Sequence, residues 1–265
     1  MFDSGVGGLS VLREIIEMLP NEQYVYYGDN ANCPYGPKGE SFIRQRADEI
    51  TQLLLKHGCQ AIVVACNTAT SYSIEYLRDH YTIPFIGMVP AVKPAAKITH
   101  TGVVGVLATA GTLNAPLYNR IKETYGKDVK IVEHVGQGFV ELVEALDIDS
   151  PHAEAIVEAS VQPIMSKGAD TLVLGCSHYP FLLKVIKRVA NRLKRADVND
   201  VDVIDPAPAI AKNLVNVLSG KNISVNDGTF QIKLISSGDD NVIYRLCKTF
   251  ITKHKKGISG KAAYK

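Results

Sequence analysis

The chain has 265 residues, of which 46% are apolar and 21% charged, so it has the composition of a globular protein with one large domain or two of ordinary size. Its 29 basic and 27 acidic residues nearly cancel, which gives no indication of a nucleic-acid or membrane partner. No apolar stretch approaches the roughly 20 residues that cross a bilayer, and no secretory signal opens the chain, so we expect a cytoplasmic protein.

The five cysteines are scattered along the chain, and no two have the Cys-x-x-Cys spacing. An odd, scattered set argues against a disulfide framework and against a structural zinc site. The missing Cys-x-x-Cys also disfavours a thiol-disulfide oxidoreductase. We therefore expect reduced thiols.

The first part of the chain alternates between strand and helix patterns. A glycine-rich turn over 3–8 leads at once into an amphipathic run over 9–19. Such a turn normally follows a strand, so we expect a truncated or misassigned start. The pattern then predicts strands over 23–28, 61–65 and 83–88, and helices over 39–57 and 69–80.

Pro84, Pro90 and Pro94 interrupt the pattern, and we expect the chain to cross there into a second half. The pattern restarts with predicted strands over 102–108, 129–135, 171–175 and 201–205, and helices over 113–125, 139–146, 153–167 and 181–195. The rest, a helix over 207–218, a strand over 230–236 and a helix over 240–250, is expected to return to the first half. We expect the basic tail over 253–265 to be a frayed, solvated terminus.

Strands that alternate with helices indicate parallel sheets flanked by helices. We therefore predict an α/β fold of two similar, pseudo-symmetric domains. The first comprises residues 1–92 and 206–265, and the second comprises residues 93–205.

Two stretches, one in each half, resemble each other. Residues 61–65 and 171–175 are short apolar runs, and each is followed by a cysteine and polar residues, at Cys66 and Cys176. Such runs suit strands that are buried on both faces, and ligands bind at the carboxyl ends of parallel strands. The repeat favours an active site to which both halves contribute. The alternative is a pair of buried structural cysteines.

Other polar residues near these strand ends have both functional and structural interpretations. Asn67, Thr68, Thr109 and Thr112 could donate hydrogen bonds to a ligand's carboxylates or could cap helices. His178 could tune the Cys176 thiol, bind a metal with it, or simply pack.

The glycine-rich turn invites a nucleotide interpretation, with Asp29 at about the right distance to bind a ribose. The third glycine position is occupied by Ser10, however, and a small carboxylate at the helix start is the better candidate.

Four motifs in order along nearly the whole chain resemble the glutamate racemase family. They are Asp3-Ser4-Gly5-Val6-Gly7-Gly8, Pro34-Tyr35-Gly36, Ala65-Cys66-Asn67-Thr68-Ala69 and Gly175-Cys176-Ser177-His178-Tyr179-Pro180. The resemblance implies two α/β domains with the active site in the cleft between them. It also implies interconversion of L- and D-glutamate for peptidoglycan synthesis, without cofactor or metal, by a homodimer.

The resemblance also implies roles for individual residues. Cys66 and Cys176 are then the two bases, Asp3, His178 and Glu144 assist them, and the remaining motif positions bind the amino acid. Those substrate-binding positions are Asp3, Ser4, Tyr35, Gly36, Asn67, Thr68, Thr109, Thr112, Ser177 and His178. The Glu144 match is weaker, because Gly136-Gln137-Gly138 stands where Ala-Cys-Pro is expected. Cys33 replaces a bulkier apolar residue and adds a third thiol near the expected pocket.

The chemistry agrees with these residues. Inverting a Cα centre without pyridoxal phosphate requires one base on each face of the carbon, and a thiol needs neighbours to set its protonation. A racemase for aspartate or another small acid is the alternative within the superfamily. A non-catalytic amino-acid-binding regulator is the alternative from another class, but it has no need of two opposed cysteines.

Overall fold

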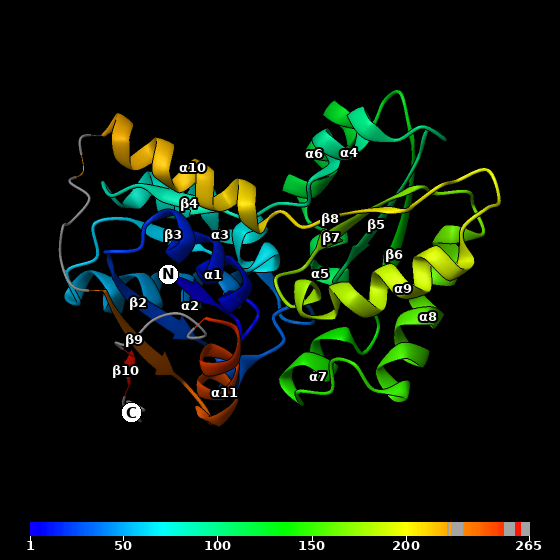
Figure 1. Ribbon diagram of the computed structural model, residues 1–265. Coiled ribbons are helices and arrows are strands. Elements are labelled where there is room, and N and C mark those ends of the chain that lie inside the picture. Colours follow the sequence, from blue (N-terminus) through cyan, green and yellow to red (C-terminus); the bar gives the residue numbers. More distant parts are fainter. Residues whose placement is uncertain (222, 224–229, 252–257, 261–265) are drawn as a thin grey trace. The chain divides into compact units, whose positions relative to one another are not determined.

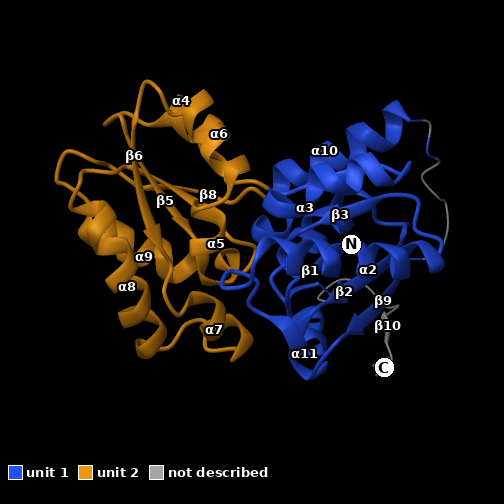
Figure 2. Ribbon diagram, turned by 180° about the vertical axis from the view of Figure 1, so that it is seen from behind, with its two compact units in different colours: residues 1–88, 207–265 blue, residues 89–206 orange. Residues whose placement is uncertain are grey.

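The computed structural model describes residues 1–221, 223, 230–251 and 258–260 (Figure 1). The chain forms two compact units (Figure 2), one of residues 1–88 with 207–265 and one of residues 89–206. The expected domain limits were at 92 and 206, so the chain enters the second unit four residues earlier than expected, before Pro90. Among the described residues, no helix has the length and apolar character needed to span a membrane.

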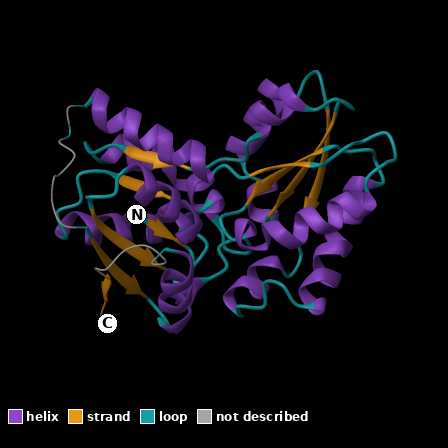
Figure 3. Ribbon diagram, viewed as in Figure 1, coloured by secondary structure: helices purple, strands orange, loops and turns teal. Residues whose placement is uncertain are grey.

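The first unit contains a six-stranded, fully parallel sheet in the order β10-β9-β2-β1-β3-β4. Its strands are β1 (Phe2–Asp3), β2 (Gln23–Gly28), β3 (Ile62–Val64), β4 (Phe85–Gly87), β9 (Gln231–Ser236) and β10 (Ile258–Gly260). Its helices are α1 (Leu9–Met18), the short η1 (Asn30–Asn32), α2 (Glu40–Lys56), α3 (Asn67–His80), α10 (Ala207–Gly220) and α11 (Asn241–Phe250). Helix α1 contacts α10 and α11, while α2 contacts α3, so two groups of helices flank the sheet (Figure 3).

The second unit contains a four-stranded parallel sheet in the order β6-β5-β7-β8. Its strands are β5 (Val103–Ala108), β6 (Lys130–Val135), β7 (Thr171–Gly175) and β8 (Asp202–Ile204). Its helices are α4 (Val92–Ile98), α5 (Ala110–Leu113), α6 (Pro116–Tyr125), α7 (Phe139–Glu144), α8 (Pro151–Met165), the short η2 (Tyr179–Leu182) and α9 (Leu183–Leu193). Helix α4 contacts α6, and α8 contacts α9.

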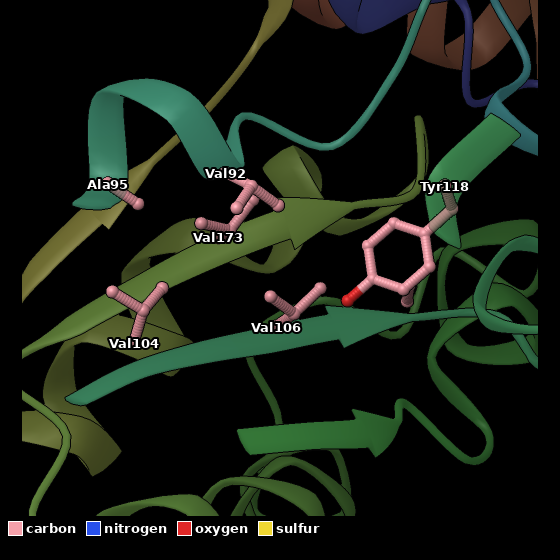
Figure 4. Packing of buried hydrophobic residues seen from close by; sticks show 7 residues of the cluster. Val92, Ala95, Val104, Val106, Tyr118 and Val173 are labelled. Carbon is pink, nitrogen blue, oxygen red and sulfur yellow. The ribbon is translucent and has the colours of Figure 1, made fainter. Parts of the chain in front are cut away.

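Valines from neighbouring strands form the core on one face of the second sheet (Figure 4). Val104 and Val106 of β5 lie beside Val173 of β7, and α4 and α6 cover them. All these side chains are fully buried, which is why the strands read as continuous apolar runs in the sequence. The same packing holds β5 and β7 in place, and both of these strands end near candidate site residues.

The two sheets share one strand order. Numbered within each unit, β2-β1-β3-β4 and β6-β5-β7-β8 both read second, first, third, fourth. In this order the second strand lies on one side of the first strand, and the third and fourth strands lie on the other side. Ligands of such sheets bind at the carboxyl ends of the first and third strands, where the strand order reverses. The prediction of two similar α/β halves with parallel sheets is confirmed.

Three local predictions were wrong. Helix α4 lies where only a crossing was expected; Pro94 is its third residue, where the helix does not yet need a backbone N–H. The predicted helix over 113–125 is interrupted, because Ala115 precedes Pro116 and is extended. Residues 258–260 of the basic tail form β10 and pair with β9, so this part is not frayed. The rest of the tail lies outside the described residues.

Candidate active site

In the first unit, the strand end that carries Cys66 lies beside the one that carries Asp3 and Ser4. The backbone N–H of Ala65 donates to the carbonyl of Phe2 at 2.8 Å, which sets the ends of β3 and β1 side by side. The Ser4 Oγ lies 3.6 Å from the Cys66 Sγ. Both residues are buried. The sheet therefore brings three residues that the motifs singled out to one edge.

Cys66 caps helix α3 through its sulfur. The backbone N–H of Ala69 donates to Sγ at 3.4 Å, and the Cys66 backbone is extended, as is usual for a residue that caps a helix. A donor at a helix N-terminus stabilises a thiolate more than a neutral thiol. The helix-capping role that the sequence allowed for Asn67 and Thr68 is thus taken by Cys66.

Asn67 and Thr68 form the first turn of α3 and are almost fully buried. The Asn67 side chain is only 2% exposed, and neither its Nδ2 nor its Oδ1 has a hydrogen-bond partner among the described residues. An unsatisfied buried amide costs about 1–3 kcal/mol, so such a group indicates a missing partner such as a ligand or a water molecule.

The glycine-rich turn folds around the Asp3 carboxylate. Asp3 Oδ1 accepts a hydrogen bond from the Gly5 N–H at 2.8 Å, and Tyr26 Oη donates to the Gly5 carbonyl at 2.7 Å. A side chain at Gly8 would place a Cβ 2.9 Å from the Asp3 Cβ, so only glycine lets α1 start this close to the strand end. A carboxylate of the chain itself thus occupies the turn that the nucleotide interpretation reserved for a phosphate.

Tyr35 and Gly36 lie in a loop that is held by Asp29. Tyr35 Oη donates to Asp29 Oδ2 at 2.6 Å, and Asn32 donates to both carboxylate oxygens at 3.1 Å. Arg46 of α2 completes a two-pronged ion pair, with Nη2 2.8 Å from Oδ1 and Nε 3.0 Å from Oδ2. Asp29 is therefore committed to Arg46 and the loop, which overturns the suggestion that it binds a ribose.

The protonation of this cluster follows from its contacts. Burial by itself raises the pKa of Asp29, but hydrogen bonds from Arg46, Tyr35 and other donors outweigh it, so the pKa is lowered. Burial and the neighbouring Asp29 charge raise the pKa of Tyr35, so its hydroxyl stays protonated. This cluster was not predicted from the sequence. Its only signal was Asp29 directly after a predicted strand.

In the second unit, Cys176 lies at one end of a chain of three side chains. The Cys176 Sγ is 3.8 Å from His178 Nδ1, and His178 Nε2 is 2.7 Å from Glu144 Oε1. Ser177 Oγ lies 3.5 Å from the same Nδ1. His178 is 2% exposed, whereas the Glu144 side chain keeps 23% of its surface in solvent. The weakest of the motif matches, Glu144, therefore directly contacts His178.

Thr109 lies next to Cys176 because β5 and β7 are paired. Ala108 is opposite Gly175 in the register, so the residue after each strand emerges at the same edge. Thr109 caps the short helix α5, accepting from the Thr112 N–H at 3.3 Å, and the two threonine hydroxyls are 3.0 Å apart. The capping role is therefore present, and the hydroxyl pair still lies at the same sheet edge as the thiol.

In the part of each unit that the structure describes, the side chains do not form a metal site on their own. Within either unit, the described residues contain no three His, Cys, Asp or Glu side chains whose ligand atoms converge closely enough to hold one ion. The interpretation of Cys176 and His178 as a metal pair thus finds no third ligand within its own half.

Comparison with known proteins identifies the family. Residues 6–214 match the Asp/Glu/hydantoin racemase family. The chain belongs to this family. It is 43% identical to a glutamate racemase of Herpetosiphon aurantiacus over 90% of this chain and 92% of that one.

Solved structures of the racemase family agree. A glutamate racemase isoform from Bacillus anthracis is 31% identical, with a TM-score of 0.85 over 99% of this chain and 95% of that one. The glutamate racemase of Escherichia coli, solved with L-glutamate and the activator UDP-MurNAc-Ala, is 30% identical, with a TM-score of 0.82 over 98% and 96%.

Gly136, which stands where the family resemblance predicts alanine, lies against a tyrosine. Tyr179 Oη donates to the Gly136 carbonyl at 3.3 Å. A Cβ on residue 136 would lie 2.5 Å from the Tyr179 Oη and 2.9 Å from the Phe139 ring. Gly138, with φ of +78°, then starts helix α7, which ends at Glu144. The departure is visible in the sequence, but its contact with Tyr179, 43 residues further along the chain, depends on the fold.

Proposed function

We propose that this member of the racemase family interconverts L- and D-glutamate without a cofactor or metal. Cys66 and Cys176 act as the two bases. The activity named for the relatives supports glutamate as the substrate, and the family's role supports supply of D-glutamate for peptidoglycan in the cytoplasm. Aspartate is the alternative substrate; turnover rates of both amino acids, measured with the same enzyme, distinguish the two.

The equivalent position of the two cysteines is the observation that carries this proposal. Each thiol follows the third strand of a sheet whose strand order is repeated in the other half, next to the end of the first strand. A pair of structural cysteines needs no such equivalence and no polar partners. Two thiols with separate partners meet the requirement for one base on each face of the substrate Cα.

At Cys176, the side-chain contacts describe a route for the proton. The Glu144 carboxylate accepts from His178 Nε2–H, which leaves the lone pair of Nδ1 toward the thiol. Nδ1 then takes the thiol proton to form the thiolate, and Glu144 stabilises the imidazolium. The thiolate removes the Cα proton of one enantiomer, and in the reverse direction the protonated thiol returns one.

At Cys66, backbone and hydroxyl groups replace the histidine. The Ala69 N–H stabilises the thiolate, and Ser4 lies beside the sulfur. Asp3, next to Ser4 at the end of β1, is the group that we assign to proton transfer at this thiol. The two bases thus have different surroundings, although both reach the same substrate carbon.

Substrate binding uses the remaining polar residues at the two strand ends. Asn67, with its unsatisfied amide, is assigned to the substrate together with Thr68, Thr109, Thr112 and Ser177. The Tyr35–Gly36 loop contributes through its backbone and ring, because the Tyr35 hydroxyl is held by Asp29. Donors at helix starts suit the carboxylates of an amino acid.

An isotope experiment tests the two-base mechanism. In deuterated water at early conversion, product should carry deuterium at Cα, while recovered substrate stays almost unlabelled. The reason is that the base that delivers the proton is not the base that removed it. By family resemblance, Cys66 acts on D-glutamate and Cys176 on L-glutamate. Substantial retention of protium in the product would show a single base and overturn the proposal.

Serine substitutions provide the second arm. Cys66→Ser and Cys176→Ser should each abolish racemisation but still bind glutamate, because a hydroxyl keeps the shape and is a far weaker acid. Cys59→Ser, at a half-buried thiol before the start of β3, is the matched control and should keep full activity. A Cys176→Ser enzyme with a near-normal rate would contradict the assignment.

Light scattering at working concentration tests the homodimer that the family resemblance implies.

A further inference from the structure

The turn that follows β9, residues 236–238, contacts the loop that contains η1. β9 and β2 are paired in register, with Ser236 opposite Gly28, so both strands end at the same edge of the sheet. The Ser237 N–H donates to the Gly28 carbonyl at 3.1 Å, which continues the pairing by one residue. Ser237 therefore emerges beside Asp29, the residue that follows β2.

Two hydroxyl groups of the 236–238 turn bind η1. Ser237 Oγ accepts from the Ala31 N–H at 3.1 Å, and Ser236 Oγ donates to Asn30 Oδ1 at 3.2 Å. The Gly238 N–H donates to Ser236 Oγ at 3.1 Å, which fixes the turn itself. In both contacts with η1 the partners are 206 residues apart in the chain, so only the fold brings them together.

Glycines let η1 lie close to the turn and to the end of β2. A Cβ on Gly238 would be 3.0 Å from the Ala31 nitrogen, which is tighter than ordinary contact. A Cβ on Gly28 would be 2.6 Å from Asn30 Oδ1. η1 is therefore packed against both strand ends, and a change in the 236–238 turn is transmitted to it.

Ser237 also supports the carboxylate that holds the Tyr35 hydroxyl. Burial by itself raises the pKa of Asp29, but hydrogen bonds outweigh it. The donors, in order of their effect, are Arg46, Tyr35, Ser237 and Asn32. The Ser237 hydroxyl thus accepts from the backbone of η1 and donates to Asp29.

Tyr35 lies within electrostatic reach of Cys66. Burial and the Asp29 charge raise the pKa of Tyr35, and the charge of a Cys66 thiolate adds to this effect. A displaced Tyr35 loop would therefore alter the surroundings of the thiol and also lose its own contacts with substrate.

We propose that Ser237 is a positioning residue of the reaction, which holds η1 and Asp29 so that the Tyr35–Gly36 loop stays at the substrate. The 236–238 turn lies outside the segment 6–214 that matches the family. The inference rests on the proposed function for the identity of the substrate. Its positional part concerns the loop in the free enzyme.

The test compares the wild-type chain with three variants. Ser237→Ala removes the acceptor of the Ala31 N–H, and Ser237→Thr keeps a hydroxyl there. Thr249→Ala is the matched control, because it removes an exposed hydroxyl of α11 that binds only the carbonyl of Arg245, at 2.8 Å, among the described residues. For each protein, kcat and KM are measured with L- and D-glutamate, together with the melting temperature.

Amide hydrogen exchange measures the loop without substrate. The probes are the amides of Cys33 and Lys38, which donate to the carbonyls of Asn30 and Tyr35 at 3.2 and 3.0 Å. They lie on either side of the Tyr35–Gly36 pair, so both should exchange faster when the loop is released.

Ser237→Ala should raise KM about 3- to 10-fold in both directions, with kcat within about twofold of wild type. Exchange at Cys33 and Lys38 should be at least about threefold faster. The melting temperature should change by less than about 2 °C, because the bond to Ala31 is exposed and water can replace it. Ser237→Thr should restore the wild-type values, and Thr249→Ala should keep them.

An unchanged KM or unchanged loop exchange in Ser237→Ala would overturn the proposal, and so would equal changes in Thr249→Ala. A wild-type enzyme that does not racemise glutamate would refute the proposed function. Loop exchange would then still decide whether Ser237 holds the loop, so the two failures are distinguishable.

Discussion

Glu144 contacts the ring nitrogen of His178 that faces away from the Cys176 thiol. If this carboxylate holds the ring for proton transfer, Glu144→Gln keeps the shape but loses the charge that stabilises the imidazolium. We expect kcat to fall about 10- to 100-fold in both directions, with KM nearly unchanged. Steady-state kinetics with L- and D-glutamate measure this.

Glu141→Gln is the control for this change, because Glu141 is an exposed residue of the same helix. It should leave both constants as they are. A Glu144→Gln enzyme with a raised KM and an unchanged kcat would place Glu144 in substrate binding and remove it from the proton route.

The ion pair between Asp29 and Arg46 leads to a second prediction about single residues. Arg46→Met leaves a fully buried carboxylate without its cation, and we expect a loss of about 3–5 kcal/mol in the free energy of unfolding at pH 7. Arg44→Met, on the same helix and in an exposed pair with Glu40, should cost less than about 1 kcal/mol. Urea denaturation compares the two variants.

The effect of Arg46→Met should depend on pH in a defined direction. Because the pKa of Asp29 is lowered in the folded protein, the stability that it contributes is present above its ordinary value of 3.8. That contribution is lost as pH falls through the lowered pKa. The difference between wild type and Arg46→Met should therefore narrow in acid, and a difference independent of pH would contradict the ion-pair explanation.

The residues that could be predicted from the sequence are those with a local signature. Cys66 and Cys176 each follow an apolar run, and this pattern is visible without knowledge of the fold. Asp29 and Arg46 are 17 residues apart, on a strand end and in a helix, and only the packing of α2 against the sheet brings them together. No spacing rule connects such a pair, so the support of the Tyr35 loop could not be read from the sequence.

At the scale of elements, helix α7 is held at both ends to the segment that carries Cys176. Tyr179 binds the Gly136 carbonyl before the helix, and His178 binds Glu144 at its last turn. Gly136→Ala would place a methyl group 2.5 Å from the Tyr179 hydroxyl. We expect a loss of about 1–3 kcal/mol and a lower kcat, because the helix must shift away from His178.

A double variant separates this clash from other effects of alanine. Gly136→Ala with Tyr179→Phe removes the nearest atom, so part of the stability lost in Gly136→Ala should return. Thermal melts of the two single variants and the double variant form a cycle. Strictly additive losses would show that Tyr179 is not the cause.

Most strands and helices were predictable because their buried faces impose a period on the sequence. The errors arose where backbone geometry decided the outcome. Pro94 was taken as a breaker but lies in the first turn of α4, where proline is tolerated, while Pro116 starts a new helix inside a continuous pattern. The three-residue strand β10 is too short to produce any pattern.

For the whole molecule, the proposed mechanism requires that one glutamate contacts both halves. Saturating D-glutamate should then protect amides at both sheet edges, such as those of Ala69 in one unit and Thr112 in the other. Hydrogen exchange with and without ligand measures this, with the Tyr125 amide, at the far end of α6, as an internal control that should not change. Protection in one unit alone would contradict a shared substrate.

Cys66 is both a proposed base and the cap of α3, because its sulfur accepts the Ala69 N–H. An electrophile that alkylates this sulfur therefore removes the proposed base, and that is not its only effect. It also takes away the acceptor for the first turn of α3, which contains Asn67 and Thr68. A covalent inhibitor at Cys66 would consequently disturb the binding residues as well as the base, whereas a reagent at Cys176, which caps no helix, would leave the α3 turn intact.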